Sequence, residues 1–363
     1  MKLLILAQTP PPLHGQSLMV RTLCDGLRDT APEMEVHHVN LPLSAHTADI
    51  GRWRLGKLGV MWHAIRQTRR ILRRHGPMTL YYVPAPGKRS ALYRDWLLMF
   101  CCRGRAERLV LHWHATGLGR WLQDHATAFE RALTRRALGR ADLSLVLGEA
   151  LRADAAMLHP IRTEVLRNGI EDPCTTWQRR PPTPTPLNVL FISRCSRAKG
   201  VLIALAGVAE AHRRRPGSVR LTVAGDFEDE ATARAFNDIV RRSGAPVEHV
   251  GFAGDEAKHN LFSFADVMVF PSRYEHEAHP LVVIEALAHD LPVIVSNWRA
   301  VAENLPPDHT YVVKLDRDTP HAIADALEQV AATPRPDGAA RQHFLNHYHR
   351  DRFIQGFTHA LDT

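Results

Sequence analysis

Four residues in the second half of the chain have the charge and placement needed to hold a phosphate compound. Arg194 and Lys199 belong to one loop that leads into a predicted helix, and Glu277 and Glu285 flank the start of another, with seven residues between them. Cationic side chains and the free amides at the start of a helix together bind phosphate groups. We therefore expect the loop with Arg194 and Lys199 to bind a phosphate-bearing ligand.

Apolar strands that alternate with helices would bring these residues together. In open parallel sheets, ligands bind beyond the carboxyl ends of the strands. The candidate residues follow three strands: Arg194 and Lys199 after 188–192, Gly225 after 220–224, and Glu277, His279, Pro280 and Leu281 after 267–270. Pro280 suits the first position of the next helix, whose free amides would then face the ligand.

The alternation predicts two α/β domains, each with a parallel sheet covered by helices on both faces. In the first, we expect strands 3–7, 80–83, 108–112 and 143–147 and a helix over 18–27. In the second, we expect strands 188–192, 220–224, 248–252, 267–270, 292–296 and 311–314, and helices 201–214, 230–242, 255–264, 281–289, 320–332 and 338 to the end. The proline-rich run 179–186 is the predicted linker between domains 1–178 and 187–344, because it suits neither a helix nor a central strand.

The segment 272–288, with Glu277 and Glu285, resembles the family 4 glycosyltransferases, whose signature is two glutamates separated by seven residues. Residues 292–296 with Glu303, the Arg194 and Lys199 loop, and the Asn-Gly-Ile segment at 168–170 also fit that family. The resemblance covers most of the chain and is strongest from residue 187 to about 303. It implies the GT-B fold, two Rossmann-like domains facing each other across a cleft. We expect a last helix, at about 345–363, to pack back on the first domain.

The resemblance also implies roles for single residues. In the second domain, Arg194 and Lys199 would neutralise the diphosphate of a nucleotide sugar, Glu277 with the amides around 279–281 would hold the sugar, and Glu285 would accept hydrogen bonds from the ribose. In the first domain, Gly15 would let the backbone approach the diphosphate, with Gln16 beside it, and His114 would be an active-site histidine. The sequence departs from the pattern at Gln16, Ala278, Ser193 and 298–300, which affects the identity of the sugar more than the reaction.

The implied reaction is transfer of a hexose or related sugar with retention, without a metal or other cofactor. Cations and helix amides aimed at the departing diphosphate would supply the stabilisation. Two patterns compete with a metal-free site. His112 and His114 read as a metal pair, but no further ligands of suitable spacing accompany them. Residues 316–318 imitate an Asp-x-Asp metal motif, but their place after the last strand favours a surface turn.

Charge and composition bear on the surroundings of the enzyme. The formal net charge is +8, and all of the excess lies in residues 1–172, most densely over 52–74, where arginines alternate with apolar residues. That stretch indicates either an amphipathic helix on an anionic membrane surface or a helix packed on its own domain. No nucleic-acid-binding motif accompanies it, so we expect no nucleic acid partner. Five scattered cysteines and a first apolar run too short for a leader indicate a cytoplasmic protein, which the membrane-binding alternative for 52–74 would place at the inner face of the membrane.

We therefore expect a glycosyltransferase whose acceptor is a lipid-linked (polyprenyl) or growing cell-surface glycan. Two alternatives stay open from the sequence. One is a nucleotide-sugar epimerase of the same architecture, and the other is a catalytically inactive, membrane-associated subunit.

Overall fold

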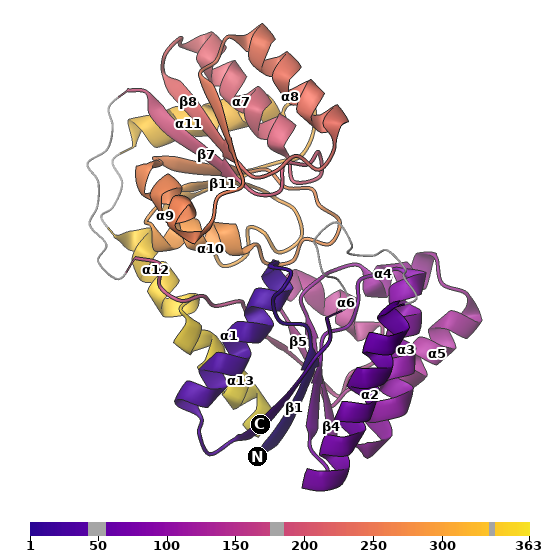
Figure 1. Cartoon of the computed structure of the whole chain (residues 1–363). Coiled ribbons are helices and arrows are strands. Elements are labelled where there is room, and N and C mark those ends of the chain that lie inside the picture. Colours follow the sequence, from indigo (N-terminus) through magenta and orange to yellow (C-terminus); the bar gives the residue numbers. More distant parts are fainter. Residues whose placement is uncertain (43–55, 175–184, 334–337) are drawn as a thin grey trace. The chain divides into compact units, whose positions relative to one another are not determined.

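Two six-stranded parallel sheets, one in each half of the chain, form the framework of the computed structural model, which describes residues 1–42, 56–174, 185–333 and 338–363. The described residues divide into two compact units (Figure 1). Unit 1 is Met1–Gly169 together with Arg350–Thr363, and unit 2 is Ile170–His349. Each unit has its own sheet and its own buried core, as the alternation of strands and helices predicts.

The sheet of unit 1 has the strand order β2-β1-β3-β4-β5-β6, with all neighbours parallel. Its strands are β1 (Lys2–Ala7), β2 (Glu35–Asn40), β3 (Thr79–Tyr82), β4 (Arg108–Trp113), β5 (Leu143–Val146) and β6 (Arg162–Val165). The central strands are apolar runs that are buried on both faces, whereas most residues of the edge strands β2 and β6 are only partly buried.

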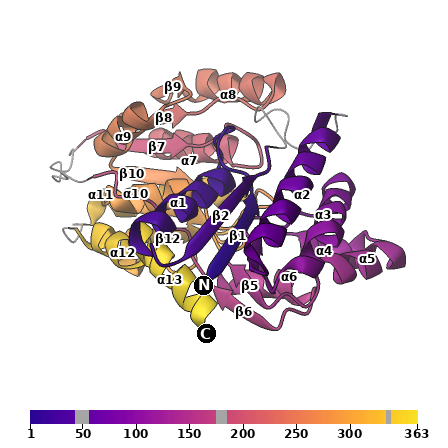
Figure 2. The same ribbon diagram turned by 60° about the horizontal axis from the view of Figure 1, so that its bottom comes forward.

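Helices cover both faces of this sheet. They are α1 (Gly15–Thr30), α2 (Gly56–His75), α3 (Arg89–Cys102), α4 (Leu118–Asp124), α5 (Ala128–Leu138), α6 (Arg152–Ala156) and α13 (Arg350–Asp362), with 3-10 turns η2 (Arg103–Arg105) and η3 (Glu149–Leu151). The last helix, α13, lies beside α1 on one face, and α2 and α3 lie side by side on the other (Figures 1 and 2). The C-terminal helix therefore completes unit 1 by packing on α1, which lies at the other end of the sequence.

The sheet of unit 2 has the order β12-β11-β10-β7-β8-β9 and is also parallel throughout. Its strands are β7 (Leu187–Ile192), β8 (Val219–Ala224), β9 (Val247–Gly251), β10 (Val267–Phe270), β11 (Val293–Ser296) and β12 (Thr310–Val313). The chain builds β7, β8 and β9 in one direction and then returns to place β10 on the other side of β7. The direction of the strand order thus reverses between β7 and β10.

Two apolar clusters sandwich this second sheet. The helices of unit 2 are α7 (Val201–Arg214), α8 (Glu230–Ser243), α9 (Asp255–Phe264), α10 (Leu281–Ala288), α11 (Thr319–Ala332) and α12 (Ala339–His347), with the 3-10 turn η4 (Pro307–His309). One cluster joins the sheet to α7, α8 and α11, and the other joins it to α9, α10 and α12. Figure 1 shows the two helix groups on opposite faces of the sheet.

The division of the chain differs from the expected boundaries at two places. Unit 1 ends at Gly169 rather than at 178, because Asp172 pairs with Arg341 (2.6 Å) inside unit 2. Most of the predicted linker 179–186 lies outside the described residues. The helix expected from 338 to the end is two helices, broken at residues 348–349, because the chain there pairs with Ile170 before it joins unit 1.

Among the described residues, every helix is too short or too polar to cross a membrane.

Candidate functional site

The loops after β7 and β10 meet at the carboxyl edge of the second sheet, where the strand order reverses. At such a switch point the loops of adjacent strands turn to opposite faces, which leaves room for a ligand beyond the strand ends. The loop after β7 carries Arg194 and Lys199, and the loop after β10 carries Glu277. The sequence prediction that these two loops share one sheet edge is confirmed.

Lys199 and Glu277 form a partly buried ion pair at this point. The Lys199 Nζ donates to Glu277 Oε1 at 3.0 Å and to Oε2 at 2.8 Å, and the Ser272 hydroxyl donates to the same Oε2 at 2.7 Å. The ammonium also lies 4.8 Å from the centre of the Tyr274 ring. Glu277 is almost fully buried, so its charge depends on these donors. The pair therefore holds the Lys199 ammonium in place at the carboxyl edge of the second sheet.

The turn that carries Arg194 depends on a glycine. Gly225 follows β8 with a φ of +127°, and a Cβ there would lie 1.9 Å from the Ser193 carbonyl oxygen. Only glycine allows this backbone and this approach. The Arg194 side chain is half-exposed, and its guanidinium lies 3.5 Å from the Glu228 carboxylate. Arg194 and Gly225 are thus neighbours, and the guanidinium stays accessible to a ligand.

Helix α10 begins at Leu281, beside the ion pair. Pro280 is the N-cap residue of this helix and not its first residue, so the predicted position of Pro280 was wrong by one. His279, just before it, is buried, and its ring lies 5.3 Å from the ring of Tyr348. The first amides of a helix have no partner within the helix, so those after Pro280 are donors directed at this edge.

Glu285 is held by a lysine that the sequence analysis missed. Lys258, on α9, donates to Glu285 Oε1 at 2.6 Å. The other carboxylate oxygen, Oε2, is buried without a hydrogen-bond partner among the described residues. Burial raises the pKa of Glu285, and the Lys258 charge opposes that shift. The two residues are 27 positions apart, so the sequence gives no signal for the pair. The packing of α9 beside the sheet brings them together.

In unit 1 the strand order reverses between β1 and β3, and histidines lie near that edge. His114 follows β4, and its ring centre is 4.0 Å from that of His112, whose Nδ1 is 2.8 Å from the Tyr81 hydroxyl. Burial, with a smaller effect of His14, lowers the pKa of His114 to about 3. The Nε2 of His114 is buried with no hydrogen-bond partner in the described part of the chain. His114 is therefore a neutral imidazole at physiological pH.

His14, another residue that the sequence analysis missed, positions Gly15 and Gln16. It is the N-cap of α1, and its Nδ1 accepts a hydrogen bond from the Ser17 amide at 3.2 Å. Burial lowers the pKa of His14, which keeps the ring able to accept. Gly15 and Gln16 are consequently the first two residues of α1, with amides at the positive end of the helix. His14 and Ser17 form a capping box that starts the helix three residues before the predicted range 18–27, and this pair does not match the usual Ser/Thr-x-x-Glu/Gln signature by which sequence could have found it.

The basic stretch 52–74 is described from residue 56 onward, as α2. Its apolar residues Met61, Ile65 and Leu72 are buried in unit 1, as the packed-helix alternative predicts. The outward face carries arginines and one large apolar side chain, Trp62, which is 54% exposed.

Comparison with known proteins identifies the second unit. Residues 186–333 match the family model described as glycosyl transferases group 1. A glycogen synthase of Mycobacterium tuberculosis is 30% identical over 273 residues, which cover 70% of this chain and 64% of that relative. The chain therefore spans less than two thirds of the length of this curated relative.

Solved structures show the same fold over the whole chain. Sucrose-phosphate synthase from Thermosynechococcus elongatus covers 100% of this chain and 98% of its own, with a TM-score of 0.71 and 18% identity. HepE of Anabaena, solved in complex with UDP-glucose, covers 100% and 99%, with a TM-score of 0.68 and 17% identity. The two parallel sheets have the GT-B topology expected from the sequence, and the placement of the units across a cleft stays a prediction. Over residues 186–333 the chain is thus similar to the glycosyl transferases group 1 family, as the resemblance of its sequence predicts.

Proposed function

We propose that the chain is a retaining glycosyltransferase that moves a hexose or related sugar from a nucleoside diphosphate to an acceptor. The observation that carries the proposal is the pairing of Lys199 with Glu277 at the switch point of unit 2. The family match and the UDP-glucose bound to HepE support a nucleotide sugar as the donor.

The cations of this edge would act on the leaving group. In the transfer, the bond from the sugar C1 to the phosphate oxygen breaks and a bond from C1 to the acceptor oxygen forms. The acceptor proton goes to the departing diphosphate, on the same face of the sugar. Lys199 uses two of its three donors on Glu277 and keeps one for a phosphate oxygen. Arg194 and the first amides of α10 would stabilise the same charge, so the transfer step needs no metal.

The remaining site residues would bind the rest of the donor. The unpartnered Oε2 of Glu285 is an acceptor suited to a ribose hydroxyl, and Lys258 holds the carboxylate in place. Glu277 and the backbone at His279 and Pro280 would contact the sugar, and Gly225 allows the turn that carries Arg194. The assignments of His114, Gly15 and Gln16 to the reaction stay predictions.

A thermal-shift panel of UDP-, GDP- and ADP-sugars tests the donor. A ligand that binds the native state raises Tm by mass action, so one nucleotide series should raise it more than the others. Lys199→Ala should abolish most of that shift. Arg317→Ala, which removes a fully exposed cation of the same unit, should keep it. Equal shifts in both variants, or none with any nucleotide sugar, would contradict the proposal.

Release of the nucleoside diphosphate separates transfer from the two alternatives. A transferase releases it faster when a suitable acceptor is present, whereas an epimerase alters the sugar with no acceptor and keeps the sugar–phosphate bond. An inactive subunit does neither. Retention is read from the anomeric configuration of the product by NMR.

We also propose a lipid-linked or growing cell-surface glycan as the acceptor, reached at an anionic membrane. The exposed arginines and Trp62 of α2 support this proposal. Co-sedimentation with anionic vesicles tests it. Arg66→Glu with Arg70→Glu should reduce binding strongly, and the charge-matched control Arg234→Glu with Arg241→Glu should not. Binding that is absent, or equally affected by both pairs, would remove the support.

A further inference from the structure

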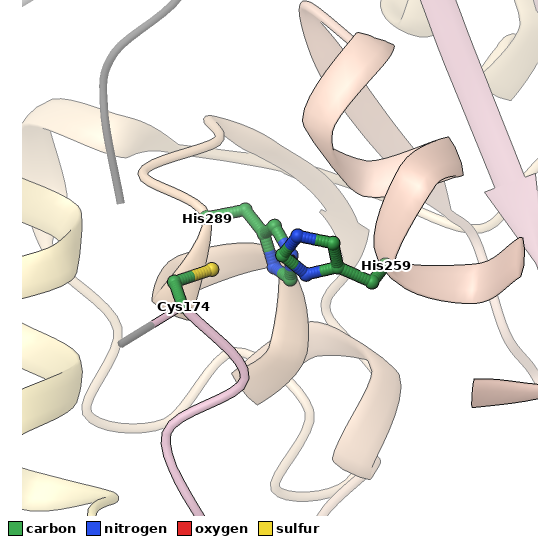
Figure 3. A group of neighbouring side chains, drawn as sticks. All are labelled: Cys174, His259 and His289. Atoms are coloured by element: carbon green, nitrogen blue, oxygen red, sulfur yellow. The ribbon is translucent and has the colours of Figure 1, made fainter. Parts of the chain in front are cut away.

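Three metal-binding side chains from separate segments converge inside unit 2, outside the loops that carry Lys199 and Arg194. Figure 3 shows Cys174, from the segment after Ile170, pointing toward His289, at the end of α10, and His259, on α9. One ligand atom from each residue lies within 4.8 Å of the other two. Cys174 and His289 are buried and His259 is partly buried, so the group is not a chance surface cluster.

Hydrogen bonds already orient His289 as a ligand and hold His259 against it. The Nδ1 of His289 lies 2.8 Å from the Glu285 carbonyl oxygen, an acceptor, so Nδ1 carries the proton and Nε2 presents its lone pair. That Nε2 is 3.0 Å from Nδ1 of His259. Ligand histidines characteristically donate their other ring N–H to a carbonyl or carboxylate in this way.

The backbone of Cys174 is fixed by a second set of contacts. Its amide donates to Asp172 Oδ1 at 2.9 Å, and its carbonyl oxygen accepts from Arg341 at 3.0 Å. Arg341 pairs in turn with Asp172. The backbone that carries the thiol is therefore already ordered, which lowers the entropic cost of organising the site when an ion binds.

We propose that Cys174, His259 and His289 bind one zinc ion, with a water molecule as the fourth ligand. One thiolate and two imidazoles suit zinc and exclude magnesium and calcium, which prefer oxygen ligands. Binding releases the thiol proton. It also moves the proton of His259 to Nε2, so that Nδ1 and His289 Nε2 both face the ion. The ion joins the segment 170–174 to α9 and α10, the two helices that carry Lys258 and Glu285.

Cobalt substitution of the full-length chain tests the site without any substrate. After removal of metals with a chelator, one equivalent of Co²⁺ should produce visible d–d bands and a near-ultraviolet thiolate-to-cobalt charge-transfer band. Zinc should displace the cobalt. Since this readout involves no sugar donor, its failure would leave the proposed transferase function untouched, and the reverse also holds.

Matched variants assign the bands to these residues. Cys174→Ser should abolish the charge-transfer band. His289→Gln should weaken zinc binding by more than about tenfold, because loss of a residue that only supports a ligand already costs about that much affinity. Cys101→Ser and His37→Asn should change neither. His37 tests the other possible cluster, Glu35, His37 and His75, which has no sulfur. X-ray absorption of the zinc-loaded wild type should show one sulfur neighbour. A site without sulfur, or no stoichiometric binding, overturns the proposal even if a variant fails to fold.

Discussion

The two units place chemically different side chains at equivalent points of their sheets. In unit 2 the reversal of strand order lies beside a buried ion pair, Lys199 with Glu277, and an accessible Arg194. In unit 1 the corresponding region holds His14, His112 and His114, and burial lowers the pKa of each. One edge is built to meet negative charge, and the other presents neutral hydrogen-bonding groups. The same strand reversal therefore carries different loop residues in the two units, and those residues decide which kind of ligand each edge would bind.

The largest expected effect tests whether the Lys199 charge in unit 2 contributes to the reaction. Lys199→Ala should lower kcat/KM by about 100- to 1000-fold, the usual cost of losing one preorganised donor to a developing anion. Initial rates of nucleoside diphosphate release measure it, with Arg317→Ala as control. Because the variant leaves Glu277 short of a donor, its folding must be checked by circular dichroism. A loss within threefold in a folded variant would refute the role of Lys199.

The histidine edge of unit 1 should matter somewhat less. His114→Ala should lower kcat/KM by about 100-fold if the neutral ring donates a hydrogen bond to the reacting complex. The exposed His125→Ala, in the same unit, is the matched control and should be unchanged. Equal rates for both variants would make His114 an ordinary buried residue and limit the chemistry to unit 2.

Glu285 should affect binding more than chemistry. Glu285→Gln removes the charge that Lys258 balances and weakens an acceptor for the ribose. We expect KM for the donor to rise about tenfold, in the range for a hydrogen bond to a charged group, with kcat nearly unchanged. Steady-state kinetics over a donor concentration series separate the two constants. A fall in kcat with constant KM would place Glu285 in the transition state instead.

The smallest effect concerns acid stability. The pKa of His114 is about 3 when folded and 6.5 as its ordinary value, so the unfolded chain takes up a proton that the folded chain refuses. Stability is therefore lost as pH falls through 6.5. Between pH 7 and pH 6 this histidine alone should account for about 0.7 kcal/mol. Hydrogen exchange of unit 1 peptides at both pH values should show a smaller loss in His114→Asn than in wild type. Identical losses would contradict a neutral, buried His114.

Local patterns in the sequence were sufficient for most of the framework. The predicted strand 267–270 and helices 201–214 and 255–264 coincide with β10, α7 and α9. Strands β2 and β6 were missed, and both are edge strands. An edge strand has polar, partly exposed residues such as His37 and Glu164, because it is covered less completely than a central strand, so it lacks the apolar run that marks the others.

The sequence by itself determined most of the strands, the glycine turn at Gly225 and the loops with Arg194, Lys199 and Glu277, because each depends on residues a few positions apart. Only the tertiary structure decided the partners: Lys258 for Glu285, His14 beside His114, and the meeting of Cys174, His259 and His289. These contacts depend on strand order and helix packing across tens of residues. No local pattern encodes such distances, since they are set by which apolar faces the whole chain buries together.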